Sequence, residues 1–146
     1  MSLLNFGAFS DAIRNIDQHV EPQPTDTRTL DQVLALLRGY RYPINTEAAL
    51  QVAVEKVLTD AGIRFVRELV LDPTNRLDFY LPDLRVALEL KIKGSVAEVT
   101  RQLFRYTQDD RIDVVVLMTS RYTHCDVPNV MRGKPIEVIT LWEGAL

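Results

Sequence analysis

Four stretches of the chain carry hydrophobic residues at every third or fourth position, which is typical of amphipathic helices. The first covers residues 3–19, and the second covers residues 29–38 and ends before a glycine. The third is capped by Asn45 or Thr46, and the fourth covers residues 95–108. The buried stripe of the third helix is expected to contain Leu50, Val54, Val57 and Leu58. That of the fourth is expected to contain Val96, Val99, Leu103, Phe104 and Tyr106.

Between residues 63 and 92 the hydrophobic period changes to two, which indicates strands. Residues 63–71, 76–81 and 85–92 alternate in this way. The gaps between them hold turn-forming residues, Asp72-Pro73-Thr74-Asn75 in the first and Pro82-Asp83 in the second. Because short turns join neighbouring strands, these three strands are expected to form an antiparallel meander.

Residues 112–120 are almost all apolar, as expected for a strand that is buried on both faces. A helix separates this strand from the one at residues 85–92. A strand, a helix and a second strand in this order predict a parallel pair with a right-handed crossover. Residues 120–135 are expected to be an irregular loop, and residues 135–142 are expected to be the last strand.

The order of these elements predicts an α/β fold, in which helices flank a mixed β-sheet. The sheet combines a three-strand meander, a crossover helix and further strands. A chain of 146 residues suits a single compact domain. Within it we distinguish an N-terminal helical extension, residues 1–44, from an α/β core, residues 45–146.

Composition narrows the possible environments of the protein. Hydrophobic residues make up 47% and charged residues 25%, and no apolar run approaches the roughly 20 residues that span a bilayer. The first residues lack the pattern of a signal peptide. Cys125 is the only cysteine, which excludes an internal disulfide and a multi-cysteine zinc site, and we interpret His124-Cys125 as part of a loop. We therefore expect a cytoplasmic protein with no membrane partner.

The net charge of −3 is not that of a protein that binds nucleic acid by bulk charge. A role with nucleic acid has to depend on a local basic surface or on a metal held by carboxylates.

Charged residues interrupt two of the predicted strands at positions that share one face. Glu89 and Lys91 are two residues apart, so they point to the same side of their strand. The alternate residues Val86, Leu88, Leu90 and Ile92 point to the other side, into the core. Asp78 lies on the preceding strand and can be brought alongside, so we expect Asp78, Glu89 and Lys91 to converge.

Two carboxylates held close together repel each other unless a cation lies between them. Magnesium takes oxygen ligands from one or two carboxylates, from water and from phosphate, and a nearby lysine can steer the attacking water. Metal-activated water attacks phosphodiesters in a known class of reaction. The alternative is a solvated polar face, in which cross-strand pairs contribute a few tenths of a kcal/mol to about 1 kcal/mol.

Over residues 45–119 this pattern resembles the PD-(D/E)xK nuclease superfamily, which has the restriction-endonuclease-like fold. The resemblance consists of an acidic residue in an early helix (Glu47), an aspartate on the second strand (Asp78) and Glu89-Leu90-Lys91 on the third. The next helix carries Gln102 and Tyr106, similar to the Q-x-x-x-Y motif of RecB-type and VRR-NUC-like members. The proline that gives the family its name is absent, since Leu77 precedes Asp78.

The resemblance implies a role for each matched residue. Asp78 and Glu89 would bind Mg²⁺ or Mn²⁺ together with the backbone carbonyl of Leu90, and Glu47 would join them directly or through water. Lys91 would position the attacking water. Gln102 and Tyr106 would orient Lys91 or contact the nucleic-acid backbone. The alternatives are a favourable first-turn charge for Glu47, an ordinary exposed residue for Gln102 and a half-buried ring for Tyr106.

Basic residues near the expected site are candidates for phosphate contacts. They are Lys93, Arg101, Arg105, Arg111 and Arg121, of which we select the first three as nucleic-acid-binding residues. The first hypothesis is therefore a magnesium-dependent deoxyribonuclease of a phage, mobile-element or defence system, helped on DNA by a protein partner or by homodimerisation. The second is an inactive module with the nuclease fold that binds DNA or protein. A third is cleavage of RNA, which the sequence does not separate from cleavage of DNA.

Overall fold

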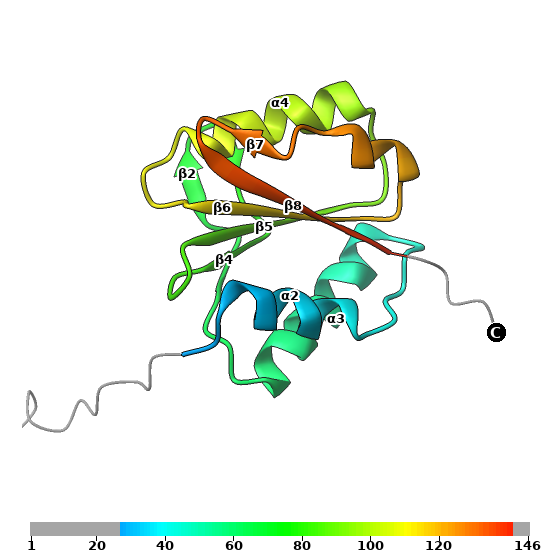
Figure 1. The fold of residues 1–146 in the computed structure, drawn as a ribbon. Helices are drawn as coiled ribbons and strands as arrows, with labels where there is room; N and C mark the ends of the chain where they lie inside the picture. Colours follow the sequence, from blue (N-terminus) through cyan, green and yellow to red (C-terminus); the bar gives the residue numbers. More distant parts are fainter. Residues whose placement is uncertain (1–26, 142–146) are drawn as a thin grey trace, which may run out of the picture.

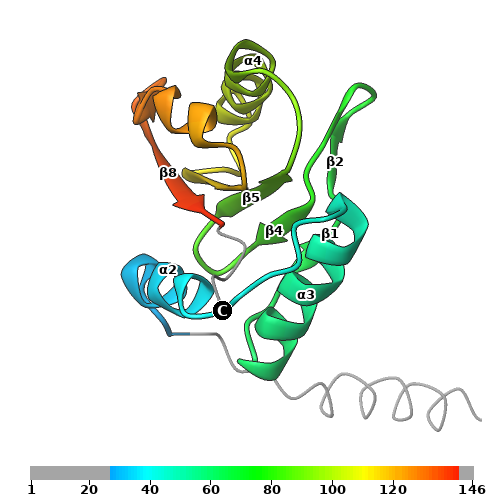
Figure 2. The ribbon, with the colours of Figure 1, turned by 90° about the vertical axis from the view of Figure 1, so that its right-hand side faces the viewer.

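Within residues 27–141, a mixed six-stranded sheet forms the centre, with one α-helix on one face and two on the other (Figures 1 and 2). The computed structural model describes residues 27–141. The helix expected over residues 3–19 lies outside them. The α/β fold and the mixed sheet are confirmed.

The described elements follow the predicted order. The helices are α2 (Leu30–Arg38), α3 (Glu47–Asp60), α4 (Val96–Thr107) and a short 3-10 helix, η1 (Tyr122–Asp126). The strands are β1 (Val66–Arg67), β2 (Val70–Asp72), β3 (Asn75–Arg76), β4 (Phe79–Leu81), β5 (Val86–Lys91), β6 (Val114–Thr119), β7 (Val130–Met131) and β8 (Lys134–Thr140). The sheet has the order β1-β4-β5-β6-β8-β7, and β2 pairs with β3 in a separate two-stranded sheet.

Side-chain caps fix where each helix starts. The Thr29 and Ser95 hydroxyls accept from a backbone N–H three residues on, and each begins a capping box at α2 or α4. Of the two candidates for α3, Thr46 is the cap, and its hydroxyl accepts from the N–H of Ala49. The helices expected in the described part of the chain are therefore confirmed.

The first two strands of the meander are broken, which the alternating pattern did not predict. Glu68 has a φ of 52°, in the left-handed region, and it separates β1 from β2. The chain then forms the β2–β3 hairpin before it re-enters the main sheet at β4. The N–H of Leu77 donates to the carbonyl oxygen of Leu69, and the N–H of Glu68 donates to that of Asp78. These two hydrogen bonds join the two broken strands across the bend.

The second half of the sheet is parallel at its centre. Strand β5 pairs with β4 antiparallel and with β6 parallel, and β6 pairs parallel with β8. The parallel pair expected across α4 is thus confirmed. The expectation of an irregular loop over residues 120–135 was incomplete, because this segment contains η1 and the short strand β7, which pairs with β8. Two-residue strands carry too few positions to show a period.

The sheet separates two hydrophobic clusters. One joins α2 and α3 to the sheet face that carries Leu88 and Leu90. The other joins α4 to the opposite face, which carries Ala87 and Leu117. Helix α2 belongs to the first cluster through Val33, Leu34 and Leu37, so the described part of residues 1–44 packs in the same core as α3. Within residues 27–141, no helix has the length and apolar character needed to cross a membrane.

Candidate active site

Asp78 lies directly before β4 and next to β5. Phe79 lies opposite Leu88 in the antiparallel register, which places Asp78 one step before β4 on the side of Glu89. The N–H of Leu90 donates to Asp78 Oδ2 at 2.8 Å. The structure therefore brings Asp78 and Glu89 together on neighbouring strands, as the alternation of the side chains predicted.

Glu89 is the most buried acidic group of this site, with a relative exposure of 2%. Its Oε1 accepts from Gln102 Nε2 at 3.0 Å and lies 3.2 Å from Lys91 Nζ. Its Oε2 lies 3.0 Å from the hydroxyl of Tyr106. Lys91 is more accessible than Glu89, with 21% of its side chain exposed, so the site reaches solvent on the side of the lysine.

The hydroxyl of Tyr106 has one proton and two acceptors within reach. Glu89 Oε2 and the carbonyl oxygen of Arg76 each lie 3.0 Å from it, and Gln102 Nε2 donates to it at 2.7 Å. When Glu89 is ionised, Tyr106 donates to Glu89. When Glu89 is protonated, Glu89 can donate to Tyr106 while Tyr106 donates to Arg76. The contacts thus suit either protonation state of Glu89.

Burial makes the ionised form of both carboxylates costly. Burial and the nearby charge of Asp78 raise the pKa of Glu89 to about 8, although Lys91 and Tyr106 oppose this rise. Burial also raises the pKa of Asp78, against the N–H of Leu90 and the charge of Lys91. A further positive charge placed between the two carboxylates would favour their ionised forms.

Glu47 lies beside the C-terminal end of β5, which carries Lys91. It is in the first turn of α3, and its Oε1 accepts from the N–H of Ile92 at 3.4 Å. Its charge adds to the rise in the pKa of Asp78, after the larger effect of burial. In a strand, the N–H and C=O of one residue point the same way, so the carbonyl of Leu90 faces the side on which Asp78 lies. Over residues 27–141, no three His, Cys, Asp or Glu side chains lie together as a metal-binding group.

Two residues that the sequence analysis did not select complete the surroundings of Asp78. Gln51 Nε2 donates to Asp78 Oδ1 at 3.2 Å, and Gln51 Oε1 accepts from Arg67 Nη2 at 3.2 Å. Arg67 also pairs with Glu55 at 2.6 Å and lies 4.7 Å from the centre of the Phe79 ring. Because a guanidinium only donates, Arg67 fixes which end of the Gln51 amide points to Asp78.

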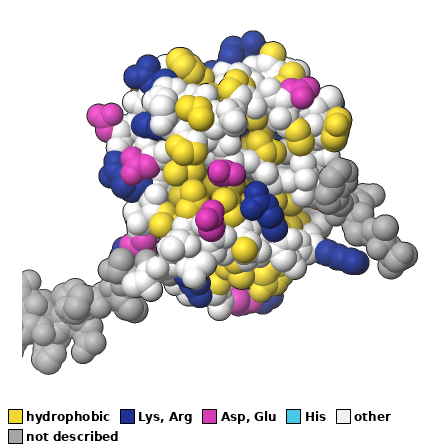
Figure 3. Space-filling model, in the orientation of Figure 1, with side chains coloured by type: hydrophobic (Ala, Val, Ile, Leu, Met, Phe, Trp, Pro, Cys, Tyr) yellow, Lys and Arg dark blue, Asp and Glu magenta, His cyan; other side chains and the backbone are white. Residues whose placement is uncertain are grey.

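The three basic residues expected to contact phosphate are exposed. Lys93 follows β5, and Arg101 and Arg105 lie on α4. Arg105 Nε donates to Asn75 Oδ1, at the start of β3, at 2.8 Å. On the face shown in Figure 3, positive and negative side chains are interspersed around a central hydrophobic region. This mixture agrees with the small net charge of −3.

Phe104 does not belong to the buried stripe of α4, contrary to the prediction. Its side chain is 43% exposed, whereas Val99, Leu103 and Tyr106 are buried. The helical positions of these residues explain the difference, since Phe104 lies about 100° round the helix from Leu103.

Comparisons with protein-family models, with curated proteins and with solved structures found no match for this chain. The contacts of the site are therefore the basis on which a function is proposed.

Proposed function

We propose that the chain is a metal-dependent deoxyribonuclease of the PD-(D/E)xK type, with a restriction-endonuclease-like core. The main support is the position of Asp78 beside Glu89 and Lys91, at the ends of two adjacent strands. The contacts of Gln102 and Tyr106 with Glu89 add to it, because an ordinary solvated face has no need of a buried glutamate.

The donors fit a hard divalent cation. Asp78 and Glu89 would bind Mg²⁺ or Mn²⁺ with the backbone carbonyl of Leu90, and Glu47 would join directly or through water. Two carboxylates and a carbonyl suit magnesium, which keeps several waters and takes further oxygens from phosphate. The raised pKa of both carboxyl groups also agrees with a cation site, because a bound cation would stabilise the ionised forms that burial makes costly. When bound, it would lower the pKa of a water molecule and neutralise charge on the phosphate.

The side chains of this chain then have separate tasks. Lys91 holds the attacking water and offers positive charge to the phosphate. Gln102 and Tyr106 hold Glu89 in place through both of its oxygens. In the reaction, the water oxygen forms a bond to phosphorus, the bond from phosphorus to the leaving oxygen breaks, and that oxygen takes up a proton. Lys93, Arg101 and Arg105 contact the phosphates on either side.

One observation favours a second candidate, an inactive module that binds DNA or protein. Both oxygens of Glu89 already have donors, and Lys91 forms an ion pair with it. These contacts satisfy the carboxylate without a metal. A protein of this kind would bind a partner through the same surface and would hydrolyse nothing.

Cleavage assays separate the two candidates. The full chain is incubated with linear, circular and branched DNA, and with RNA, with and without Mg²⁺ or Mn²⁺. We expect metal-dependent cleavage of DNA, and a loss of at least about 100-fold in Asp78→Asn, Glu89→Gln and Lys91→Met. Asp60→Asn, which removes an exposed carboxylate at the end of α3, is the matched control and retains activity. Cleavage without metal, or equal cleavage by all four variants, would contradict the proposal.

Two further expectations extend this proposal. A net charge of −3 gives no general electrostatic attraction to DNA, so we propose that a protein partner or a homodimer strengthens DNA binding. The placement in a phage, mobile-element or defence system remains a prediction from the sequence.

A further inference from the structure

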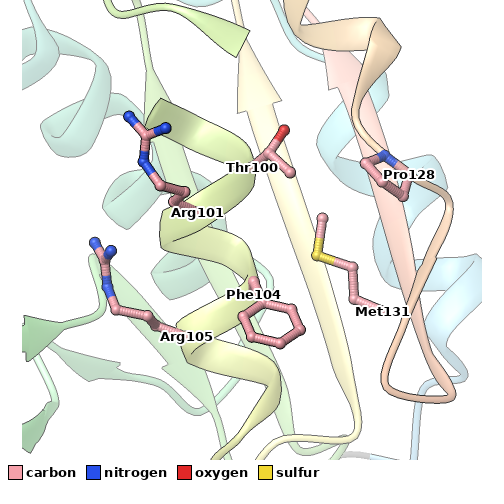
Figure 4. Close-up of a pocket in the computed structure, with 6 residues that line it drawn as sticks. All are labelled: Thr100, Arg101, Phe104, Arg105, Pro128 and Met131. Atoms are coloured by element: carbon pink, nitrogen blue, oxygen red, sulfur yellow. The ribbon is translucent and has the colours of Figure 1, made fainter. Parts of the chain in front are cut away.

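A groove of about 370 Å³ lies between α4 and the segment that carries Pro128 and Met131 (Figure 4). Thr100 and Phe104 form its wall on α4, and Pro128 and Met131 form the opposite wall, between η1 and β8. Phe104 is 43% exposed, and its ring lies at this groove. The groove therefore offers a flat aromatic surface to a ligand.

Two arginines accompany this apolar surface. Arg101 and Arg105 complete the lining, and none of the six lining residues is acidic. Their guanidinium groups point away from Phe104, toward the side of α4 that carries Arg105's contact with Asn75. A ligand that suits both features has a flat apolar part for the groove and negative charge for the arginines. A nucleotide has this chemistry, with its base and its phosphate.

The order of side chains around α4 connects the groove with the candidate site. At about 100° per residue, Gln102, Arg105, Arg101 and Phe104 follow one another around the exposed half of the helix. Glu98, whose carboxylate accepts from the N–H of Ser95, lies one turn before Gln102 on the same side. Gln102 contacts Glu89, so this order leads from the site, past two cations, to the groove. Half the circumference of a helix of about 10–12 Å diameter is about 16–19 Å. At about 3.4 Å per stacked nucleotide, about five nucleotides span this distance.

We propose that the groove binds an unpaired nucleotide of the DNA strand that is held at the candidate site. Its base stacks on Phe104, and the phosphates between the groove and the site lie against Arg101 and Arg105. The base has to be unpaired, because a base inside a duplex is already stacked and has no free face for the ring. The substrate is therefore DNA with a single-stranded flank. This inference rests on the proposed nuclease function.

Binding is measured by fluorescence anisotropy in chelator, so that no cleavage occurs. The probes are a duplex with a short oligothymidine flank and the same duplex with blunt ends. We expect Phe104→Ala to weaken binding of the flanked duplex about 5- to 100-fold and to leave the blunt duplex unchanged. Phe104→Trp, which keeps a stacking ring, retains the affinity. Arg101→Gln lowers the dependence of binding on salt by about one phosphate contact.

Matched controls use exposed residues on the opposite face of the sheet. Tyr40→Ala removes an aromatic ring that is 50% exposed, and Arg38→Gln removes an exposed cation of α2; both bind the flanked duplex like the unmodified protein. Equal affinity of Phe104→Ala and the unmodified protein for the flank overturns the inference. So does a preference for an oligouridine flank, which would make the ligand RNA. A change of oligomeric state in Phe104→Ala overturns it as well, since the groove would then join two copies of the chain.

The inference and the proposed function fail in different ways. If the unmodified protein binds the flank through Phe104 but never cleaves with Mg²⁺ or Mn²⁺, the nuclease proposal fails and the groove remains a DNA site of a binding module. If metal-dependent cleavage occurs but is insensitive to the flank and to Phe104, the groove assignment fails alone.

Discussion

Glu89 makes the stability of the metal-free protein depend on pH. Burial and the charge of Asp78 raise its pKa from 4.5 to about 8 in the folded protein, so the folded state binds this proton more tightly than the unfolded chain. The resulting stabilisation is fully present below about pH 4.5 and is lost as the pH rises through about 8. Asp78, whose pKa is also raised by burial, acts in the same direction. We expect the free energy of unfolding to fall from about pH 5 to about pH 8.

The variant Glu89→Gln tests this expectation in urea unfolding with chelator present. A glutamine amide donates to Tyr106 and accepts from Gln102, as a protonated glutamate does. The variant should therefore lose most of the decline in stability with pH, whereas Asp60→Asn should keep it. An unchanged decline in Glu89→Gln would assign the pH dependence to other groups.

Gln51 and Arg67 form a pair that holds Asp78, and their coupling can be measured without any assumption about function. Each single change, Gln51→Met or Arg67→Met, removes the same hydrogen bond, so the effects on unfolding should not add. We expect a coupling energy of about 0.5–2 kcal/mol from a double-mutant cycle in urea. Gln51→Met with Asp60→Asn is the comparison cycle, since Asp60 pairs with Lys56 and lies outside the network of Gln51 and Arg67. Additivity within about 0.3 kcal/mol would show that the pair is not coupled.

Among single residues, the sequence predicted the charged residues of the site better than the residues that hold them in place. Asp78, Glu89 and Lys91 follow from the two-residue period of a strand and a short turn. Gln51 and Arg67 do not, because their contacts span 27 and 16 positions and depend on where α3 lies against the sheet. A lone glutamine in a helix carries no periodic signal of such a role.

The loop from β5 to α4 connects the two elements that supply most of the site. Gly94 lies in it with a φ of 98°, a conformation that side chains rarely adopt, and its carbonyl accepts a hydrogen bond from the buried His124. We expect Gly94→Ala to lower the free energy of unfolding by about 1–3 kcal/mol. Gly39→Ala is the control, because Gly39 has a φ of −75° and should tolerate a methyl group. Equal effects of the two changes in urea unfolding would contradict this explanation.

Long elements with many periodic positions were predicted well, and short or bent ones were not. Helices α3 and α4 and strands β5 and β6 each supply six or more positions, so their patterns are distinct. Strands β1, β2 and β3 have two or three residues each, and the bend that separates β1 from β2 is at Glu68. A glycine at this position would have indicated a bend in the sequence, because glycine readily adopts the left-handed conformation. A glutamate rarely adopts it and therefore does not indicate one.

For the whole molecule, the candidate site depends on both layers that cover the sheet. Glu47 and Gln51 come from α3, in one hydrophobic cluster, while Gln102 and Tyr106 come from α4, in the other. Asp78 and Glu89 lie between them, from strands that the unfolded chain does not hold together. The site therefore exists only when both layers are packed, and a ligand of the site binds the folded state alone.

This dependence predicts that a divalent cation stabilises the entire fold. At a free concentration of about 100 times its dissociation constant, Mg²⁺ or Mn²⁺ should raise the free energy of unfolding by about 2.7 kcal/mol, because the unfolded chain has no site. Asp78→Asn should abolish the increase, and Asp60→Asn should retain it, since Asp60 lies at the far end of α3. Urea unfolding with the cation, and with sodium chloride at the same ionic strength, measures the effect. An equal increase in Asp78→Asn would mean that the cation acts elsewhere on the protein, and the metal site would have to be abandoned even if DNA still bound.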